Sequence, residues 1–184
     1  MINKMIILAA IVIASFAFTS HESTATTALS AEKLSSKTIK IAPELSAKIE
    51  MEQLYTSFAS VNTTMPSLIA FSNGMTGYDK LKEENKIENE ILTIVDFSLP
   101  STAKRMWILD MTTQRVLFNT YVSHGKNTGG NKATKFSNTP NSFQSSLGFY
   151  VTAETYYGKN GLSLFIDGME EGFNSKARER YVVI

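Results

Sequence analysis

The spacing of apolar residues changes once along this chain of 184 residues, near residue 90, and that change constrains the fold more than any other feature. Between residues 43 and 90, apolar residues recur at the three- and four-residue steps of amphipathic helices. From Ile91 onward, short apolar runs and alternating segments predict strands. Helices followed by a series of strands favour an α+β fold. We therefore expect a mainly β fold with two N-terminal helices.

Two helices are predicted in residues 43–90. Pro43 suits the first turn of one helix and Pro66 can open the next, although Gly74 and Gly77 weaken the second helix. The apolar stripe of the second helix indicates core packing rather than a ligand groove. The charged run from Lys80 to Glu90 is expected to be a solvated connector. The stripes consist of Leu45, Ile49, Leu54, Phe58 and Val61 in the first helix and Leu68, Phe71, Met75, Tyr78 and Leu81 in the second.

Strands are predicted at residues 91–97, 105–111, 115–122, 147–153, 162–167 and 181–184. The first two are almost continuously apolar and are expected to be buried, with Pro100 interrupting the segment between them. The second and third are expected to form a hairpin. A long loop rich in Gly, Asn, Thr and Lys follows the third strand. Because the chain stops inside the last apolar run, we expect the β fold to be C-terminally incomplete.

The amino terminus has the features of a secretory signal. A positive charge in residues 1–4 precedes an uncharged apolar run, Met5 to Phe18, which is too short to cross a bilayer of about 30 Å as a helix. We expect a signal peptide over residues 1–20 and a flexible leader over residues 21–42, and the alternative is an uncleaved membrane anchor. The protein is then predicted to be exported, periplasmic or associated with the cell envelope, without stable membrane insertion after cleavage of the signal.

Composition excludes several classes of function. Eighteen Lys and Arg against seventeen Asp and Glu give a net charge of +1, so nucleic acid is not an expected partner. Without cysteine, these residues provide no disulfide, thiolate ligand or cysteine nucleophile. The two histidines, His21 and His124, are too few for a zinc site, and we expect neither a metal nor a cofactor. Ser145 and Ser146 have only His124 nearby as a base and no orienting carboxylate, which favours a polar strand entrance over a nucleophile.

One stretch of the chain is cationic. Between Met111 and Ala153 there is no Asp or Glu, whereas Arg115, Lys126, Lys132 and Lys135 are positively charged. Such a segment is complementary to a ligand that bears carboxylates. The alternative is that the lysines only solubilise a long loop. Lys126, Lys132 and Lys135 are our candidate substrate-binding residues.

Several segments resemble the murein L,D-transpeptidase catalytic domain family, in its YkuD-like, Bacteroidetes-type branch. The similar segments are residues 92–98, 100–102, 104–105, 108–110, 117–120, 123–127, 136–138, 144–150, 154–158 and 177–180. The resemblance implies a mostly β fold that binds the stem peptides of peptidoglycan. It also implies exchange of a peptide bond between an L- and a D-centre through a cysteine thioester.

The sequence departs from this family at its catalytic residues. The family has a His-Gly pair after a Val-Ile strand and a Ser-x-Gly-Cys segment later, and neither follows Val183-Ile184 here. His124 lies in an earlier loop that matches another part of the family pattern, so the resemblance assigns no catalytic residue. We expect a helical segment at 43–90 and an incomplete catalytic domain at 91–184. Two functions stay open: an exported L,D-transpeptidase-like protein that is inactive as given, and a non-catalytic exported peptidoglycan-binding domain.

Overall fold

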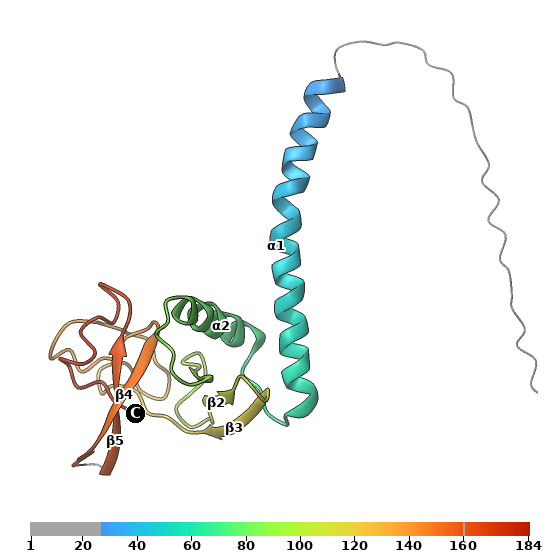
Figure 1. Cartoon of the computed structure of the whole chain (residues 1–184). Helices are drawn as coiled ribbons and strands as arrows, with labels where there is room; N and C mark the ends of the chain where they lie inside the picture. Colours follow the sequence, from blue (N-terminus) through green and yellow to red (C-terminus); the bar gives the residue numbers. More distant parts are fainter. Residues whose placement is uncertain (1–26, 160) are drawn as a thin grey trace, which may run out of the picture. The chain divides into compact units, whose positions relative to one another are not determined.

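The computed structural model describes residues 27–159 and 161–184, with side chains described from Pro43 onward. The predicted signal peptide and His21 lie outside the described residues. The chain divides into two compact units, Met1–Glu44 and Leu45–Ile184. The second unit contains both sheets, helix α2 and the C-terminal part of helix α1 (Figure 1). Two helices and five strands in two antiparallel sheets confirm the predicted α+β class.

Helix α1 spans Thr27–Val61 and begins earlier than predicted. The expectation that Pro43 lies in the first turn is wrong, because Pro43 is inside the helix, and residues 27–42 are helical where a flexible leader was expected. Apolar periodicity reports a buried face rather than helix formation itself. Every residue from Pro43 to Glu50 is exposed, including Leu45 and Ile49 of the predicted stripe, so α1 packs against the core only from Met51 onward. In the part of the chain that the structure describes, no helix is both long and apolar enough to span a bilayer.

Helix α2 spans Leu68–Glu83 and follows the prediction closely. Its N-cap is Ser67, whose hydroxyl accepts a hydrogen bond of 3.2 Å from the backbone N–H of Ala70. Four of its predicted stripe residues are buried, which confirms that the stripe is core packing: Phe71, Met75, Tyr78 and Leu81. The helix continues through Lys80 to Glu83, so only the remainder of the predicted connector lies outside it.

The first sheet is antiparallel in the order β1-β2-β3, with β1 at Ile91–Val95, β2 at Met106–Asp110 and β3 at Arg115–Thr120. The predicted β2–β3 hairpin is confirmed, and the Asp110 carboxylate accepts hydrogen bonds from two backbone N–H groups of its turn, at 2.9 and 3.0 Å. Strand β1 is only half-buried, contrary to expectation, because helices cover one face of this sheet.

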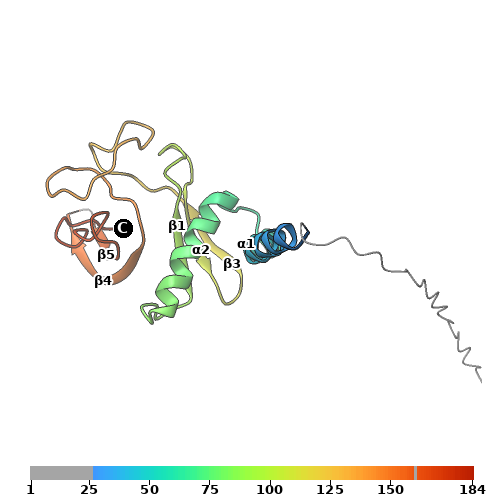
Figure 2. The same ribbon diagram turned by 90° about the horizontal axis from the view of Figure 1, so that it is seen from above.

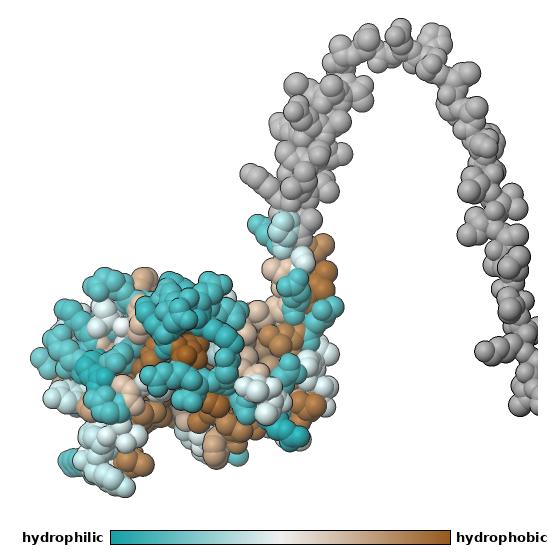
Figure 3. Space-filling view, viewed as in Figure 1, coloured by the Kyte–Doolittle hydropathy of each residue, from teal (hydrophilic) through white to brown (hydrophobic). Residues whose placement is uncertain are grey.

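The sequence predicts Val116, Phe118, Thr120 and Val122 on one face of β3, and this alternation is wrong. Leu109 pairs with Val116 and Ile108 with Phe118, which leaves Leu117 as an extra residue in a β-bulge. The bulge changes the direction of the side chains that follow it, and Phe118 is 63% exposed. Hydrophobic residues gather over β2 and β3 on the face shown in Figure 3.

The core lies between the helices and the first sheet. Helix α2 crosses one face of this sheet (Figure 2), and the last turns of α1 add Phe58. The Tyr55, Phe58 and Phe71 rings pack edge to face, with centroids 5.3 to 5.4 Å apart. The buried cluster consists of Phe58, Phe71, Met75, Tyr78, Ile94, Trp107 and Leu109.

The second sheet is a hairpin of β4, Tyr150–Gly158, and β5, Gly161–Gly168. Strand β4 starts later than predicted, because Gly148 has φ +122°, which is not a strand conformation. It also continues to Gly158 instead of ending at residue 153. The strand predicted at residues 181–184 is wrong: Tyr181 lies in a turn, and the C-terminal residues meet β5 only at an isolated bridge. Val183 forms a bridge with Phe165, and the backbones of Leu164 and Ile184 exchange hydrogen bonds of 2.7 and 3.0 Å.

Candidate ligand-binding surface

The long loop between β3 and β4 is organised around the buried residue Thr128. The Thr128 N–H donates to the carbonyl of Gly125 at 2.8 Å, and the Thr128 carbonyl accepts from the N–H groups of Thr134 and Lys135, both at 2.9 Å. These bonds close two consecutive turns, residues 125–128 and 128–135, which we call the lysine turns. The loop therefore has a defined backbone without belonging to a sheet.

The lysine turns carry all three predicted substrate-binding residues. Lys126 lies in the first turn, and Lys132 and Lys135 lie in the second. All three are exposed, and none of them forms a salt bridge with a residue that the structure describes. The structure thus brings three positive charges onto adjacent turns, where no carboxylate of the loop can neutralise them.

The start of the loop is held by Arg105, a fully buried residue that precedes β2. Its guanidinium donates to the carbonyl of Leu99 at 3.1 Å and to the carbonyl of Val122 at 3.0 and 2.8 Å. It also contacts Nδ1 of His124 at 2.8 Å and stacks over the ring of Phe97 at 5.0 Å. Burial lowers the pKa of Arg105 from its ordinary value, but that value is so high that the group stays charged.

The end of the loop is held by a second arginine, Arg180. Its two terminal nitrogens donate to the carbonyl of Ser137 at 2.7 Å and the carbonyl of Gln144 at 2.5 Å. They also donate to the hydroxyls of Ser146 at 2.5 Å and Ser142 at 3.1 Å. Among the described residues, neither arginine is paired with a carboxylate. Each end of the cationic loop is thus fixed by an arginine whose guanidinium contacts only uncharged acceptors.

The structure agrees with the expectation that Ser145 and Ser146 are structural. The Ser145 hydroxyl accepts from the N–H of Gly125 at 3.0 Å, and the Ser146 hydroxyl donates to the carbonyl of Ser137 at 3.0 Å. His124 uses both ring nitrogens elsewhere, on Arg105 and on the carbonyl of Gly130 at 2.9 Å. No serine-histidine hydrogen bond and no metal-binding group of three or more carboxylates and histidines is present in residues 43–159 and 161–184.

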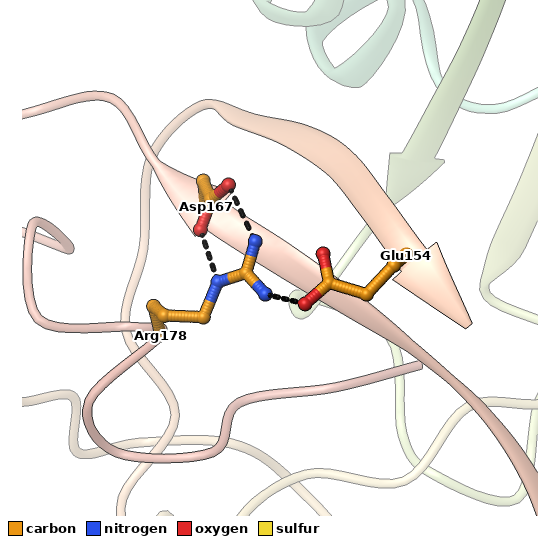
Figure 4. Close-up of polar contacts among 3 residues, drawn as sticks. All are labelled: Glu154, Asp167 and Arg178. Carbon is orange, nitrogen blue, oxygen red and sulfur yellow. Dashed lines mark hydrogen bonds and ion pairs between the residues drawn. The ribbon is translucent and has the colours of Figure 1, made fainter. Parts of the chain in front are cut away.

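A second polar cluster lies on the β4–β5 hairpin (Figure 4). Arg178 forms a two-bond pair with Asp167, at 2.7 and 2.9 Å, and also pairs with Glu154. Its guanidinium lies 4.9 Å from the ring centre of Phe165. The hydrogen bonds from Arg178 hold the pKa of both carboxyl groups below their ordinary values. One guanidinium thus pairs with two carboxylates, and the cluster fastens the C-terminal segment to the hairpin.

Two open hollows lie away from the loop. One, of about 500 Å³, is lined by residues of α1 and α2, including Met51, Leu68 and Ile69. The other, of about 360 Å³, is lined by α1 residues alone. The lysine turns line neither hollow, and their charges therefore lie on an open surface.

Sequence reasoning missed the roles of the residues that organise this surface. Arg105, Arg178 and Arg180 fall in segments that resemble the family, but they were given no role, because their partners lie 6 to 43 positions away. The sequence held one indirect signal. The segment between Met111 and Ala153 has no carboxylate, so an arginine that contacts this loop can donate only to its backbone carbonyls and uncharged side chains.

Comparison with known proteins gives one positive result. A sequence model of the L,D-transpeptidase catalytic domain matches residues 63–184, about two thirds of the chain, from the end of α1 to Ile184. No curated protein and no solved structure gave a significant match. The matched region contains α2, both sheets, the lysine turns and both arginines that hold the loop. The chain belongs to the L,D-transpeptidase catalytic domain family.

Proposed function

We propose that this protein is an exported member of its family that acts on the stem peptides of peptidoglycan and binds them through the lysine turns. The observation that carries the proposal is the family match over residues 63–184, which includes an acid-free segment with three exposed lysines that form no salt bridge among the described residues. Stem peptides contain both L- and D-centres and bear free carboxylates. A surface with three unpaired lysines is complementary to such a ligand.

The proposed chemistry is exchange of a peptide bond through a cysteine thioester. That route needs a thiolate to attack the carbonyl carbon, and none of the 184 residues is cysteine. The hydroxyls of Ser145 and Ser146 do not replace it, because both hydrogen-bond within the loop and neither contacts a base. These residues therefore bind the peptide without cleaving it, and catalysis requires a thiol from outside them.

The second candidate is a non-catalytic peptidoglycan-binding domain in the cell envelope. The absence of cysteine from these residues favours it, while the family match favours a transpeptidase. A muropeptide assay separates the two. If a cysteine-containing extension restores cross-linking, the protein is a transpeptidase; if binding persists and no extension gives turnover, it is a binding domain.

Binding is tested with isolated sacculi in a pelleting assay that includes a protein-only control. The triple variant K126Q/K132Q/K135Q should bind about tenfold more weakly at low salt, and added salt should weaken binding by the unchanged protein. The matched control K48Q/K80Q/K86Q removes the same charge outside the loop and should bind normally. Equal binding by the loop variant at every salt concentration would show that the lysines only solubilise the loop.

Export is proposed from the apolar run Met5 to Phe18 and the positive charge before it. Mass spectrometry of the protein from the cell envelope should give a mature N-terminus between about residues 18 and 29. Recovery of the chain in the cytoplasm with Met1 intact would contradict export.

A further inference from the structure

The second lysine turn is connected to the start of β2 by hydrogen bonds that pass through His124. Arg105 is completely buried, and all its guanidinium groups are donors. Its contact of 2.8 Å with Nδ1 of His124 therefore requires that Nδ1 be an unprotonated acceptor. In the neutral ring the proton is then on Nε2, which lies 2.9 Å from the carbonyl oxygen of Gly130 and donates to it.

Gly130 lies at the tip of the second lysine turn, two residues before Lys132. The tip is closed by a bridge between Gly129 and Ala133, and the space beside the Gly130 Cα is open to at least 4 Å. Side-chain packing therefore does not hold Gly130 on that side. Its neighbour Asn131 is held by a bond of 2.8 Å from the N–H of Ser101. The hydroxyls of Ser101 and Thr102 also donate to the Asn131 side chain, at 3.2 and 3.4 Å. The tip is thus attached through His124, which Arg105 holds, and through the segment between β1 and β2.

We propose that Arg105 and His124 are positioning residues that hold the lysine turns in the arrangement that binds carboxylate ligands. The inference rests on the function proposed above. Arg105 fixes the ring and its tautomer, the ring fixes the Gly130 carbonyl, and the carbonyl fixes the backbone that carries Lys132. Without this relay the Thr128 bonds and the contact of Asn131 with Ser101 still close the turn, but the Gly130 carbonyl loses its partner. The tip must then be ordered during binding, and affinity falls by the entropy of that ordering.

Arg105 contributes charge as well as position. No carboxylate among the described residues contacts it, and its nearest acceptors are two carbonyls and the imidazole. A permanent positive charge therefore lies beneath the loop whose surface carries the lysines. The relay orients the exposed charges, and the buried guanidinium adds to their field in a region of low dielectric constant.

Three substitutions of His124 divide the relay into its parts. In H124N the amide oxygen takes the place of Nδ1 and keeps the bond from Arg105, but it does not reach Gly130. In H124Q the amide nitrogen takes the place of Nε2 and keeps the bond to Gly130, but it does not accept from Arg105. H124A removes both bonds. A continuous relay requires both, so all three variants should bind sacculi about fivefold more weakly than the unchanged chain.

Two measurements separate positioning from stability and from charge. Thermal unfolding and far-ultraviolet circular dichroism must show each variant to be folded at the assay temperature. The His124 variants keep all three lysines, so their binding should keep the salt dependence of the unchanged protein, whereas K126Q/K132Q/K135Q should lose most of it. A purely structural histidine would lower Tm and leave the sacculus Kd of the folded protein unaltered.

The tautomer is tested without any substitution. With nitrogen-15 in histidine, a proton-nitrogen spectrum should assign the proton of His124 to Nε2. A proton on Nδ1 would overturn the relay. Normal binding by folded H124A, H124N and H124Q, combined with weak binding by the lysine variant, would overturn the relay and leave the proposed function standing. Normal binding by the lysine variant would overturn the proposed function itself.

Discussion

Gly77 on α2 lies where the ring of Phe149 passes the helix. A Cβ at this position would be 2.1 Å from the nearest ring carbon, so any side chain must displace the ring. The sequence suggests only that this glycine weakens a helix. The structure shows that Gly77 leaves room for Phe149, the residue before β4, to pack against α2. This contact joins the second sheet to the helix that covers the first.

G77A should therefore destabilise the protein although alanine is the better helix former. Overpacking costs about 1–3 kcal/mol, against a propensity gain of about 1 kcal/mol. Denaturant unfolding should show a lower midpoint. The matched control is G74A on the same helix, where the new Cβ would be 3.0 Å from the flexible end of Ile94 and should cost less. A more stable G77A would mean that Phe149 does not occupy this space.

Asp167 makes stability depend on pH through its pair with Arg178. The hydrogen bonds from Arg178 lower the pKa of Asp167 in the folded state. A carboxyl with a depressed folded pKa stabilises the protein above its unfolded pKa, near 3.9, and the stabilisation is lost as pH falls through the folded pKa. D167N should lower Tm at pH 7, and the difference from the unchanged protein should shrink as pH falls from about 5 toward 2.

Asp79 provides a control for which the expected change in Tm has the opposite sign. Asp79 is exposed, but partial desolvation and then the charge of Glu83 raise its pKa, so its ionised form is disfavoured in the folded state. D79N should raise Tm at pH 7 and lose this advantage at low pH. A Tm difference for D167N that is constant across the pH range would show that the pair with Arg178 does not form in solution.

At the scale of elements, Asn62 joins the end of α1 to the β2–β3 hairpin. Its amide nitrogen donates to the carbonyls of Phe58 at 2.7 Å and Gln114 at 2.9 Å, and its amide oxygen accepts from the N–H of Val116 at 2.8 Å. One side chain thus caps the helix and satisfies the hairpin turn.

N62A should leave two backbone groups of the hairpin without partners and cost about 1–3 kcal/mol. The neighbouring T63A, at an exposed position, should change the free energy of unfolding by less than about 0.5 kcal/mol. Equal midpoints for the two variants in urea would contradict this role for Asn62.

The sequence predicts the elements well where a buried face exists. The stripe of α2 and the apolar runs of β1 and β2 each pack against the core. The spacing of apolar residues in these segments therefore predicts the elements. Residues 43–50 of α1 and the second half of β4 lack such a face. Residues 154–158 are polar or aromatic, and Tyr157 is 85% exposed, so no period marks this part of β4 as a strand.

The candidate site could be predicted only in part. The acid-free segment identifies Lys126, Lys132 and Lys135 without their geometry. The residues that hold them could not be predicted, because Arg105 and His124 are 19 positions apart and Arg180 and Ser137 are 43 positions apart. Contacts of this kind depend on the tertiary fold and have no local pattern.

At the scale of the whole molecule, absence of a thiol predicts absence of turnover. The purified 184-residue chain should form no cross-linked muropeptides, because a thioester cannot form without a cysteine. A chain in which a segment with His-Gly and Ser-x-Gly-Cys follows Ile184 should gain activity. A Cys-to-Ala change in that segment is the control and should abolish the gain. Cross-linking by the 184 residues alone would require another nucleophile.

The uneven distribution of buried apolar residues implies that the molecule opens in stages. The aromatic and aliphatic cluster belongs to α1, α2, β1 and β2, whereas the buried residues after Thr128 include polar Ser146 and Asn174 beside Ile166 and Ala177. Amide protons of β1 and β2 should therefore exchange with solvent most slowly, and those of β4 and β5 should exchange through local openings of lower free energy. Arg105 attaches the start of the loop that carries the lysine turns to the slowly exchanging part of the molecule, and Arg180 attaches its end to the part that opens first. The end of the loop should therefore be released before its start.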